Sequence, residues 1–262
     1  YVAEEDRLIR VKDKNGDNIA ESETLEKLMS LPSGGHWTRT VKVIDGALYV
    51  AIGSTCNVCR ESDQLRSTIQ KCDLDGQRCE TFARGLRNTV DVTYYQGKIY
   101  GADNGRDGLG NAVPPDEINV IEKGKNYGWP ICYGQNIHDT EFDTNTYIRN
   151  PCMEPFETPA FVDLPAHDAP LGLTFYSGQT FPEFYRGKLF VAFHGSWDAD
   201  PPVGYKIVTN NTSTKEIQDF ATGWFDGKTV LGRPVGIINF RDGLLVSDDN
   251  AGKIYRIFYE AQ

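Results

Sequence analysis

Four stretches of the chain share one hydrophobic pattern: an alternating run, a short turn with glycine, and a second alternating run. Alternation with a period of two, interrupted by a turn, is typical of a β-hairpin whose strands each bury one face. The stretches occupy residues 41–54, 92–105, 181–195 and 237–250, with turn glycines at Gly46, Gly97, Gly187 and Gly243.

The spacing of these copies indicates a repeat architecture. The turn glycines are separated by 51, 90 and 56 positions, and two of these separations are close to the roughly 40 to 50 residues of a β-propeller blade. A third strand and often a fourth follow each hairpin, as STIQKCDL and ETFARGL follow the first. We therefore predict an all-β chain in which residues 1–262 form one β-propeller domain. A β-sandwich of similar strands is the alternative.

Two departures from the repeat are informative. The long separation leaves room for an insertion at about 127–170, rich in Asn, Asp, Thr and Pro, which we expect to form a functional loop. The first residues, YVAEEDRLIRVK, match the second half of the last repeat. The chain is therefore expected to be incomplete at its N-terminus and to enter partway through a blade. Helical spacing is confined to residues 22–30, which also fit an outer strand.

Composition and charge narrow the class of protein. The formal net charge is -10 and the sequence pI is near 4.9, which disfavours nucleic acid as a partner because nucleic acid is bound by clustered Lys and Arg. The mean hydropathy is -0.45, and no apolar run approaches the roughly 18 residues of a membrane span. We therefore expect a soluble chain with no membrane span.

The six cysteines form three close pairs in sequence. An even count of this kind favours disulfides, and hence export to the periplasm or the cell exterior. A zinc site and free thiols are the alternatives, but a zinc ribbon needs two Cys-x-x-Cys units and the chain has one. A c-type haem would need His where Arg60 stands. The pairs are Cys56 with Cys59, Cys72 with Cys79, and Cys132 with Cys152.

Polar side chains stand where the predicted inner strands end, and in a propeller these ends surround the central channel. Imidazole, guanidinium and amide groups in one cleft suit a polyanionic cofactor beside a proton-abstracting base. Each residue type also has a structural alternative. The Asn and Asp side chains can cap turns, the Arg side chains can form ion pairs, and a His side chain can make a structural hydrogen bond. The residues are His36, Arg87, Asn88, Asn104, Arg106, His194, Arg233 and Asp249.

The motifs around these residues resemble the glucose/sorbosone dehydrogenase family. They are GGHWTRTV, VAIGS, ARGLRNTV, ADNGRDGLG, PDEINVIEKGKNYGWP, APLGLTFYSG, FYRGKLFVAFHGSW and GRPVGI before SDDNAGKIYRI, and they run nearly end to end. The resemblance implies a six-bladed β-propeller, with roughly the last four to five blades present in this chain. It also implies binding of pyrroloquinoline quinone (PQQ) and calcium at one mouth of the channel.

The resemblance further implies roles for individual side chains. His36 matches the general base that takes the proton from the hydroxyl of the carbon being oxidised, while hydride passes to the quinone. Arg87 and Asn88 match the pair beside the reactive carbonyl, and Arg233 matches a carboxylate-binding arginine. Two further positions match polar residues that line the same pocket, Asn104 and Asp249.

Calcium ligands follow from the same resemblance. The cofactor calcium would take main-chain carbonyl oxygens from the turn at Gly105 and Arg106, which are ligands of the kind that calcium prefers. Glu117 and the carbonyl of Tyr127 match ligands of a second, structural calcium found in some members.

Two positions depart from the better-known glucose enzymes of the family. Ser54 stands where those enzymes have an aspartate that orients the base, and the lysine that they bring to the quinone has no counterpart near His194 and Gly195. These departures suit the sorbosone-like branch. We therefore expect oxidation of a sugar or aldehyde at its reducing carbon, with electrons passed to a separate acceptor such as a cytochrome. The alternative is a non-catalytic propeller that binds a carbohydrate or a protein at the channel mouth.

Overall fold

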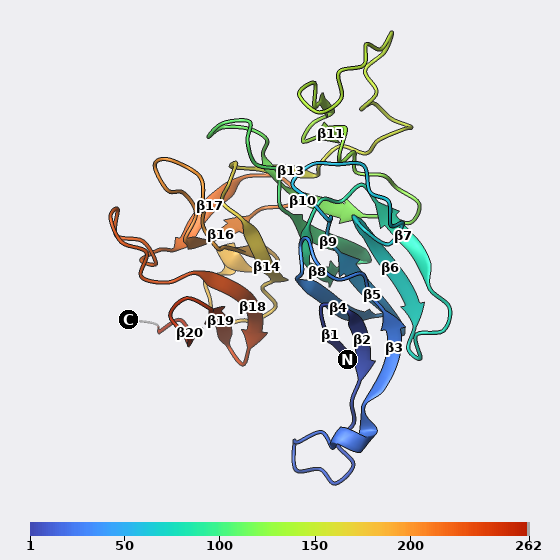
Figure 1. The fold of residues 1–262 in the computed structure, drawn as a ribbon. Coiled ribbons are helices and arrows are strands. Elements are labelled where there is room, and N and C mark those ends of the chain that lie inside the picture. Colours follow the sequence, from blue (N-terminus) through green and yellow to red (C-terminus); the bar gives the residue numbers. More distant parts are fainter. Residues whose placement is uncertain (261–262) are drawn as a thin grey trace. The chain divides into compact units, whose positions relative to one another are not determined.

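The computed structural model describes residues 1–260. Its regular structure is almost entirely β-strand (Figure 1), with 3-10 turns at Ser22–Thr24 and Glu183–Tyr185. In this described part of the chain, no helix is long and apolar enough to cross a membrane. The chain divides into two compact units: unit 1 comprises residues 1–90 and 121–159, and unit 2 comprises residues 91–120 and 160–260.

Unit 1 contains two antiparallel sheets in meander order and one short strand pair. The three-stranded sheet runs β1 (Val2–Ala3), β2 (Arg7–Arg10), β3 (Glu26–Ser30), and the four-stranded sheet runs β4 (Arg39–Ile44), β5 (Ala47–Ile52), β6 (Thr68–Asp73), β7 (Glu80–Arg84). The strand pair is β11 (Cys132–Tyr133) with β12 (Ile137–His138). The core of the unit packs Leu8 and Leu31 against Leu48, Val50 and Ile52 of β5.

The hairpin of β4 and β5 shows why the sequence folds this way locally. Arg39 pairs with Ile52 and Ile44 with Ala47, which leaves a two-residue turn. Asp45 and Gly46 both have positive φ, 48° and 75°, as a type I′ hairpin turn requires. β5 is buried along its whole length, so both ends of this hairpin are fixed by a packed central strand.

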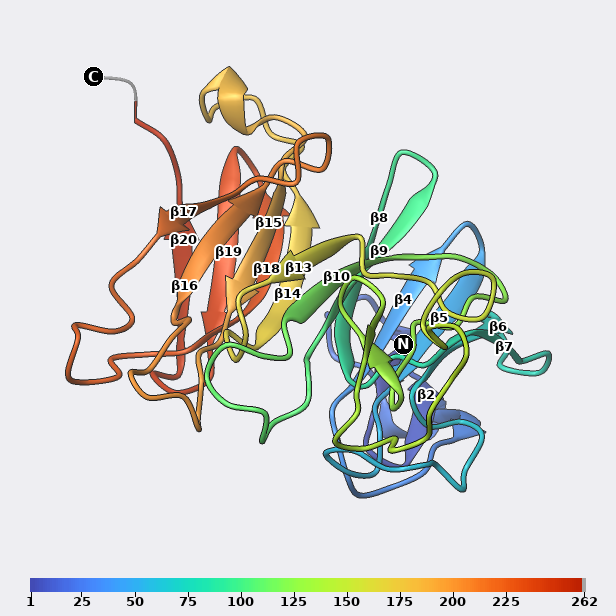
Figure 2. The ribbon, with the colours of Figure 1, turned by 90° about the horizontal axis from the view of Figure 1, so that it is seen from above.

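Unit 2 contains three antiparallel sheets (Figure 2), which again follow the chain in meander order. Its two apolar clusters are rich in aromatic side chains, such as Tyr100 and Phe175 in one and Phe181 and Phe190 in the other. The sheets are β8 (Thr89–Tyr95), β9 (Lys98–Asp103), β10 (Asp116–Ile121), β13 (Val162–Leu164); β14 (Pro170–Phe175), β15 (Leu189–Phe193), β16 (Lys206–Asn210), β17 (Ile217–Ala221); and β18 (Pro234–Phe240), β19 (Gly243–Asp248), β20 (Lys253–Ile257).

The all-β prediction is confirmed, and so are the three disulfides, which exclude zinc at the cysteines. The number of blades and the single-domain prediction stay predictions. Residues 127–170, predicted as the insertion, contain the strand pair of β11 and β12 and also β13, which is the fourth strand of the sheet that contains β10.

Two details of the hairpin prediction were wrong. Residues 181–187 form no strand and contain the 3-10 turn at Glu183–Tyr185, and β15 pairs with β14 instead. Pro182 has no N–H to donate to a sheet, and Phe181 is buried and stacked on Tyr176 with 4.5 Å between ring centroids. In the last hairpin, Phe240 pairs with Gly243, so this glycine lies in the strand and not in the turn.

Candidate functional site

His36 lies just before β4 and is held against the end of β5 by Ser54. Its backbone N–H donates to the carbonyl oxygen of Ser54 at 2.9 Å. Its ring atom Nδ1 lies 3.1 Å from that carbonyl oxygen and 2.8 Å from Ser54 Oγ. Ser54 is fully buried, so the residue that replaces the expected aspartate is the partner of the imidazole.

The hydrogen bonds around Ser54 determine which ring nitrogen carries the proton. Ser54 Oγ donates its single proton to the carbonyl oxygen of Cys56 at 2.7 Å, so this oxygen can only accept from His36. The Ser54 carbonyl is also an acceptor. Nδ1 of His36 therefore carries hydrogen, and Nε2 presents a lone pair, which is the arrangement that a general base needs.

The surroundings of His36 keep its ring neutral. Burial lowers the pKa of His36 to about 4, and the positive charges of Arg87, Arg66 and Arg39 act in the same direction. The ring is thus uncharged at neutral pH, with its lone pair available. The three guanidinium groups create a concentration of positive charge in a protein whose formal net charge is -10. Such a site favours an anion.

The predicted site residues of unit 1 lie close together around Gly53 and Ser54. A side-chain carbon added at Gly53 would lie 2.6 Å from Asn88 Oδ1 and 2.8 Å from His36 Cβ, so only glycine allows these residues to approach. The Ser54 N–H donates to the Arg87 carbonyl at 2.8 Å. Arg87 is buried, and its Nε and NH2 groups donate to the Asn57 carbonyl and to Asn57 Oδ1, both at 2.9 Å. His36, Arg87 and Asn88 therefore form one cluster.

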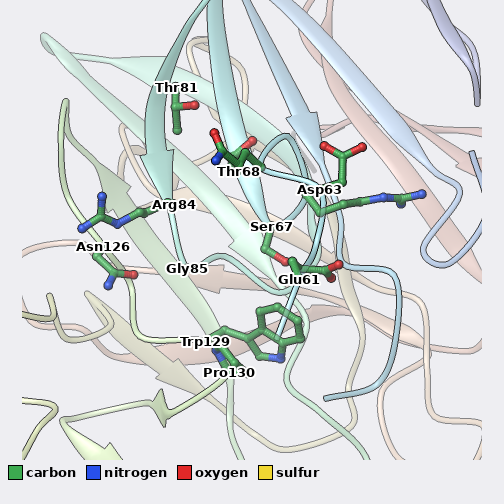
Figure 3. Close-up of a pocket in the computed structure, with 12 residues that line it drawn as sticks. Glu61, Asp63, Ser67, Thr68, Thr81, Arg84, Gly85, Asn126, Trp129 and Pro130 are labelled. Atoms are coloured by element: carbon green, nitrogen blue, oxygen red, sulfur yellow. The ribbon is translucent and has the colours of Figure 1, made fainter. Parts of the chain in front are cut away.

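A cavity of about 440 Å³ lies beside this cluster in unit 1. Figure 3 shows Arg84 and Asn126 on the side of the hollow opposite Glu61 and Asp63, with Trp129 at its lower rim. Arg66 belongs to both places, because it lines the cavity and donates to the Gly53 carbonyl at 3.3 Å. The cavity is within the size range of small-molecule sites, and most of its lining residues are polar.

In unit 2, Arg233, His194 and Asp249 form a second cluster. His194 Nε2 lies 3.0 Å from Asp249 Oδ1, and its Nδ1 lies 3.4 Å from NH1 of Arg233. Arg233 also donates to the carbonyls of Gly195 and Ser196 at 3.0 and 3.2 Å. A bidentate grip of Arg233 on a carboxylate would therefore require some of these contacts to change.

The predicted calcium turn is held in place by a buried acid in unit 2. Asp116 accepts from the N–H groups of Gly105 and Ala169 at 2.8 and 2.9 Å, and burial raises the pKa of Asp116 to about 7. A side-chain carbon at Gly105 would lie 2.7 Å from the Pro115 carbonyl oxygen. The Asn104 amide donates to the Pro170 carbonyl at 2.7 Å. Asn104, Gly105 and Arg106 thus belong to a turn that is fixed on both sides.

The second set of predicted calcium ligands is divided between the units. Glu117 is buried in β10 of unit 2, where its Oε2 accepts from Asn119 at 2.9 Å. Tyr127 is buried in unit 1, and its N–H donates to the Arg84 carbonyl at 2.9 Å. A structural calcium between these two residues stays a prediction, and so does a single well shared by the clusters of units 1 and 2.

Sequence reasoning missed three residues of these clusters. Arg39 and Arg66 add charge around His36, and Asp116 anchors the Gly105 turn. Asp116 carried a signal, because it stands directly before the buried run EINVI. The arginines carried none, because nothing in the sequence tells which long side chains fold back onto a distant histidine.

The repeated antiparallel sheets and the neutral histidine among arginines define an all-β chain with a polar site at the strand ends. The chain belongs to the TrAA12-like family, whose model matches residues 12–259. An uncharacterized protein of Borreliella burgdorferi is 40% identical over 237 residues, which are 86% of this chain and 61% of that protein.

A second sequence relative has a described activity. A pyrroloquinoline quinone-dependent pyranose dehydrogenase of Coprinopsis cinerea is 25% identical over 292 residues, covering 85% of this chain and 39% of that protein. The chain thus spans less than two thirds of the length of either sequence relative. The solved PQQ domain of the Coprinopsis enzyme matches with a TM-score of 0.77 at 21% identity, over 97% of this chain and 77% of that one.

A further solved structure supports the fold. The calcium structure of a Trichoderma reesei carbohydrate-active enzyme of family AA12 matches with a TM-score of 0.79 at 20% identity, over 95% of this chain and 75% of that one.

Proposed function

We propose that this chain is part of a PQQ-dependent dehydrogenase that oxidises a sugar or aldehyde at its reducing carbon, with His36 as the general base. The observation that carries the proposal is the state of His36: a neutral ring with Nδ1–H held by Ser54, and a lone pair on Nε2 beside three arginines. The dehydrogenase activity described for the Coprinopsis relative agrees with this chemistry.

The residues of unit 1 fit an anionic quinone. PQQ carries carboxylates, and the charges of Arg87, Arg66 and Arg39 around one neutral histidine would attract them. In unit 2, the backbone carbonyls of Gly105 and Arg106 would be the calcium ligands, in a segment that the buried Asp116 anchors through the Gly105 N–H. When bound, the quinone would supply the two-electron oxidant that accepts hydride.

The chain's own residues would then handle the proton. Nε2 of His36 would take the hydroxyl proton of the sugar, while Ser54 holds the ring through Nδ1. Arg87 and Asn88 would stabilise the negative charge that develops at the reactive carbonyl. A base with a pKa of about 4 is weak, but a bound polyanion would offset the arginine charges and raise the pKa of His36. The base would therefore strengthen only in the loaded site.

The partners of this reaction are part of the same proposal. The substrate is a small sugar or aldehyde, and a separate electron carrier such as a cytochrome reoxidises the enzyme. Three disulfides fit folding in the periplasm or outside the cell.

Loss of the base tests the proposal. His36→Ala and His36→Gln should lower dye-linked sugar oxidation, in the presence of PQQ and Ca²⁺, by about a hundredfold or more, the usual contribution of a general base. PQQ binding, measured by an absorbance titration, should be largely retained in both variants. Equal turnover in wild type and variants would refute the role of His36. An absence of any PQQ binding would refute the proposed cofactor and favour a carbohydrate-binding or protein-binding propeller.

A further inference from the structure

Three side chains of unit 2 that have no role in the proposed oxidation converge on one point: Asp107, His167 and Asp198. Their ligand atoms all lie within 4.8 Å of one another. Asp107 follows the Gly105 turn, His167 lies between β13 and β14, and Asp198 follows β15. The grouping therefore depends on the fold, because the three residues are far apart in the sequence.

The imidazole of His167 is buried and aimed at the two carboxylates. Its side chain is only 6% exposed. Nδ1 lies 3.4 Å from an oxygen of Asp198 and 3.9 Å from an oxygen of Asp107. Nε2 lies 2.8 Å from the carbonyl oxygen of Gly110, and because a carbonyl only accepts, Nε2 carries hydrogen.

The hydrogen bond between Nε2 of His167 and the Gly110 carbonyl has a consequence for Nδ1. With the proton on Nε2, a neutral ring presents the Nδ1 lone pair to two carboxylate oxygens, so three acceptors face one another. This arrangement is unfavourable unless a cation lies among them, which must be either a proton on Nδ1 or a metal ion. Histidine ligands of metals commonly donate their other N–H to a backbone carbonyl, as His167 does to Gly110.

The distances leave room for a metal ion. A tetrahedral ion with ligands at about 2.1 Å separates those ligands by about 3.4 Å; the separation between Nδ1 and Asp198 equals this value, and the separation of 3.9 Å between Nδ1 and Asp107 is longer. One imidazole and two carboxylates suit first-row divalent ions such as zinc, whereas calcium prefers sites made only of oxygen. From this geometry we propose that Asp107, His167 and Asp198 bind a zinc-class divalent cation, in a site distinct from the carbonyl ligands proposed for the cofactor calcium.

Two more buried acids, Asp116 and Asp168, interact electrostatically with His167. Burial raises the pKa of Asp116 to about 7 and that of Asp168 to about 6, so a cation at this point would favour the charged form of both carboxyl groups. Asp198 lies at the open side of the cluster, with its side chain 22% exposed, so an ion can enter from solvent without opening the core.

Calorimetry on metal-free protein tests the site. With no quinone or sugar present, ZnCl₂ at pH 7 should bind with one saturable equivalent that Asp198→Asn weakens by about tenfold or more. Asp242→Asn is the matched control, because Asp242 is exposed in unit 2 and the substitution changes the net charge equally. It should bind zinc as the wild type does. Excess Ca²⁺ should not displace the zinc.

Two direct measurements decide between a metal and a proton. X-ray absorption at the zinc edge should show one imidazole and oxygen ligands, and the imidazole signal should be lost in His167→Gln. Nitrogen NMR should show Nδ1 of His167 unprotonated in the zinc-loaded protein. Identical zinc binding by wild type and Asp198→Asn, or an Nδ1 that stays protonated in excess zinc, would overturn the proposal. Circular dichroism checks that each variant folds, and these outcomes are independent of sugar oxidation.

Discussion

His36 in unit 1 and His194 in unit 2 both lie at strand ends, yet their rings are held in opposite tautomers. His36 carries its hydrogen on Nδ1, toward uncharged Ser54 oxygens, and leaves Nε2 with a lone pair. His194 donates from Nε2 to the carboxylate of Asp249, and its Nδ1 accepts from Arg233. Both nitrogens of His194 thus contact charged partners, whereas Nδ1 of His36 contacts only uncharged oxygens of Ser54.

This difference shows how the same side chain obtains different chemistry from its partners. A carboxylate favours the charged form of an imidazole, whereas burial among arginines disfavours it. The serine in place of an aspartate is therefore consistent with a base, because it fixes the ring without adding charge. Three substitutions separate these effects. Gly53→Ala removes the packing that holds His36, Ser54→Asp changes the charge of its partner, and Asp249→Asn removes the charge of the partner of His194.

The largest effect is expected from Gly53→Ala. The added methyl group would meet Asn88 Oδ1 and His36 Cβ at less than 3 Å, so one of these side chains must move. We expect a loss of about 1 to 3 kcal/mol in unfolding free energy, and a kcat/KM for the sugar that is about a hundredfold lower. Urea unfolding and steady-state kinetics measure the two effects.

Gly46→Ala is the control for this substitution. It lies in the turn at the opposite end of the same hairpin, with positive φ and open space around it. It should cost stability and leave kcat/KM nearly unchanged. An equal loss of activity in both variants would show that stability, and not the position of His36, controls the rate.

An intermediate effect is expected from Ser54→Asp, which gives His36 a charged partner like that of His194. In the quinone-loaded wild type, kcat/KM should rise with pH through the pKa of His36, because a protonated ring cannot accept the substrate proton; this pKa is about 4 without quinone and higher in the loaded site. A carboxylate in place of the Ser54 hydroxyl, which lies 2.8 Å from Nδ1, should raise the pKa of His36 by about 1 unit or more. The pH at which kcat/KM rises, called the acid limb, should shift upward by the same amount. The change is measured by the pH dependence of kcat/KM and by an NMR titration of the ring carbon chemical shifts of His36.

Ser62→Asp adds the same charge at an exposed position of unit 1. The acid limb of kcat/KM should lie at the same pH in Ser62→Asp as in the wild type. A limb that does not move in Ser54→Asp would contradict the hydrogen bond between residue 54 and Nδ1 as the determinant of the charge on His36.

The smallest effect is expected from Asp249→Asn. The Asp249 side chain is 61% exposed, and exposed ion pairs contribute little, so quinone affinity and turnover should change by about fivefold at most. Absorbance titration and dye-linked kinetics measure both. A loss as large as that in His36→Ala would reverse the assignment and make His194 the base.

The sequence was sufficient to predict features that depend on local pattern. Alternation and glycine turns predicted the hairpin of β4 and β5, because a type I′ turn at Asp45 and Gly46 is a local property. Close cysteine pairs predicted the three disulfides in the same way. The 3-10 turn at Glu183–Tyr185 escaped prediction because burial of Phe181 against Tyr176 outweighs an apolar pattern that also fits a strand.

The electrostatics of the candidate site could not be predicted from sequence. The charge of His36 depends on Arg39 and Arg66, whose guanidinium groups come from other segments of unit 1. Its tautomer depends on one hydroxyl proton of Ser54. The pattern around His36 predicted that a histidine stands at a strand end, but tertiary packing decides what that histidine can do.

The disulfide between Cys56 and Cys59 links this proton arrangement to redox conditions. It closes a loop of only four residues, for which the chain-entropy model gives about 2 kcal/mol, against about 3 kcal/mol for the longer loop closed by Cys132 and Cys152. Its greater importance is local, because the Cys56 carbonyl is the acceptor that orients the Ser54 hydroxyl. A reductant that opens this small ring would leave that carbonyl free to turn away, and the Ser54 hydroxyl that contacts Nδ1 of His36 would lose its fixed orientation.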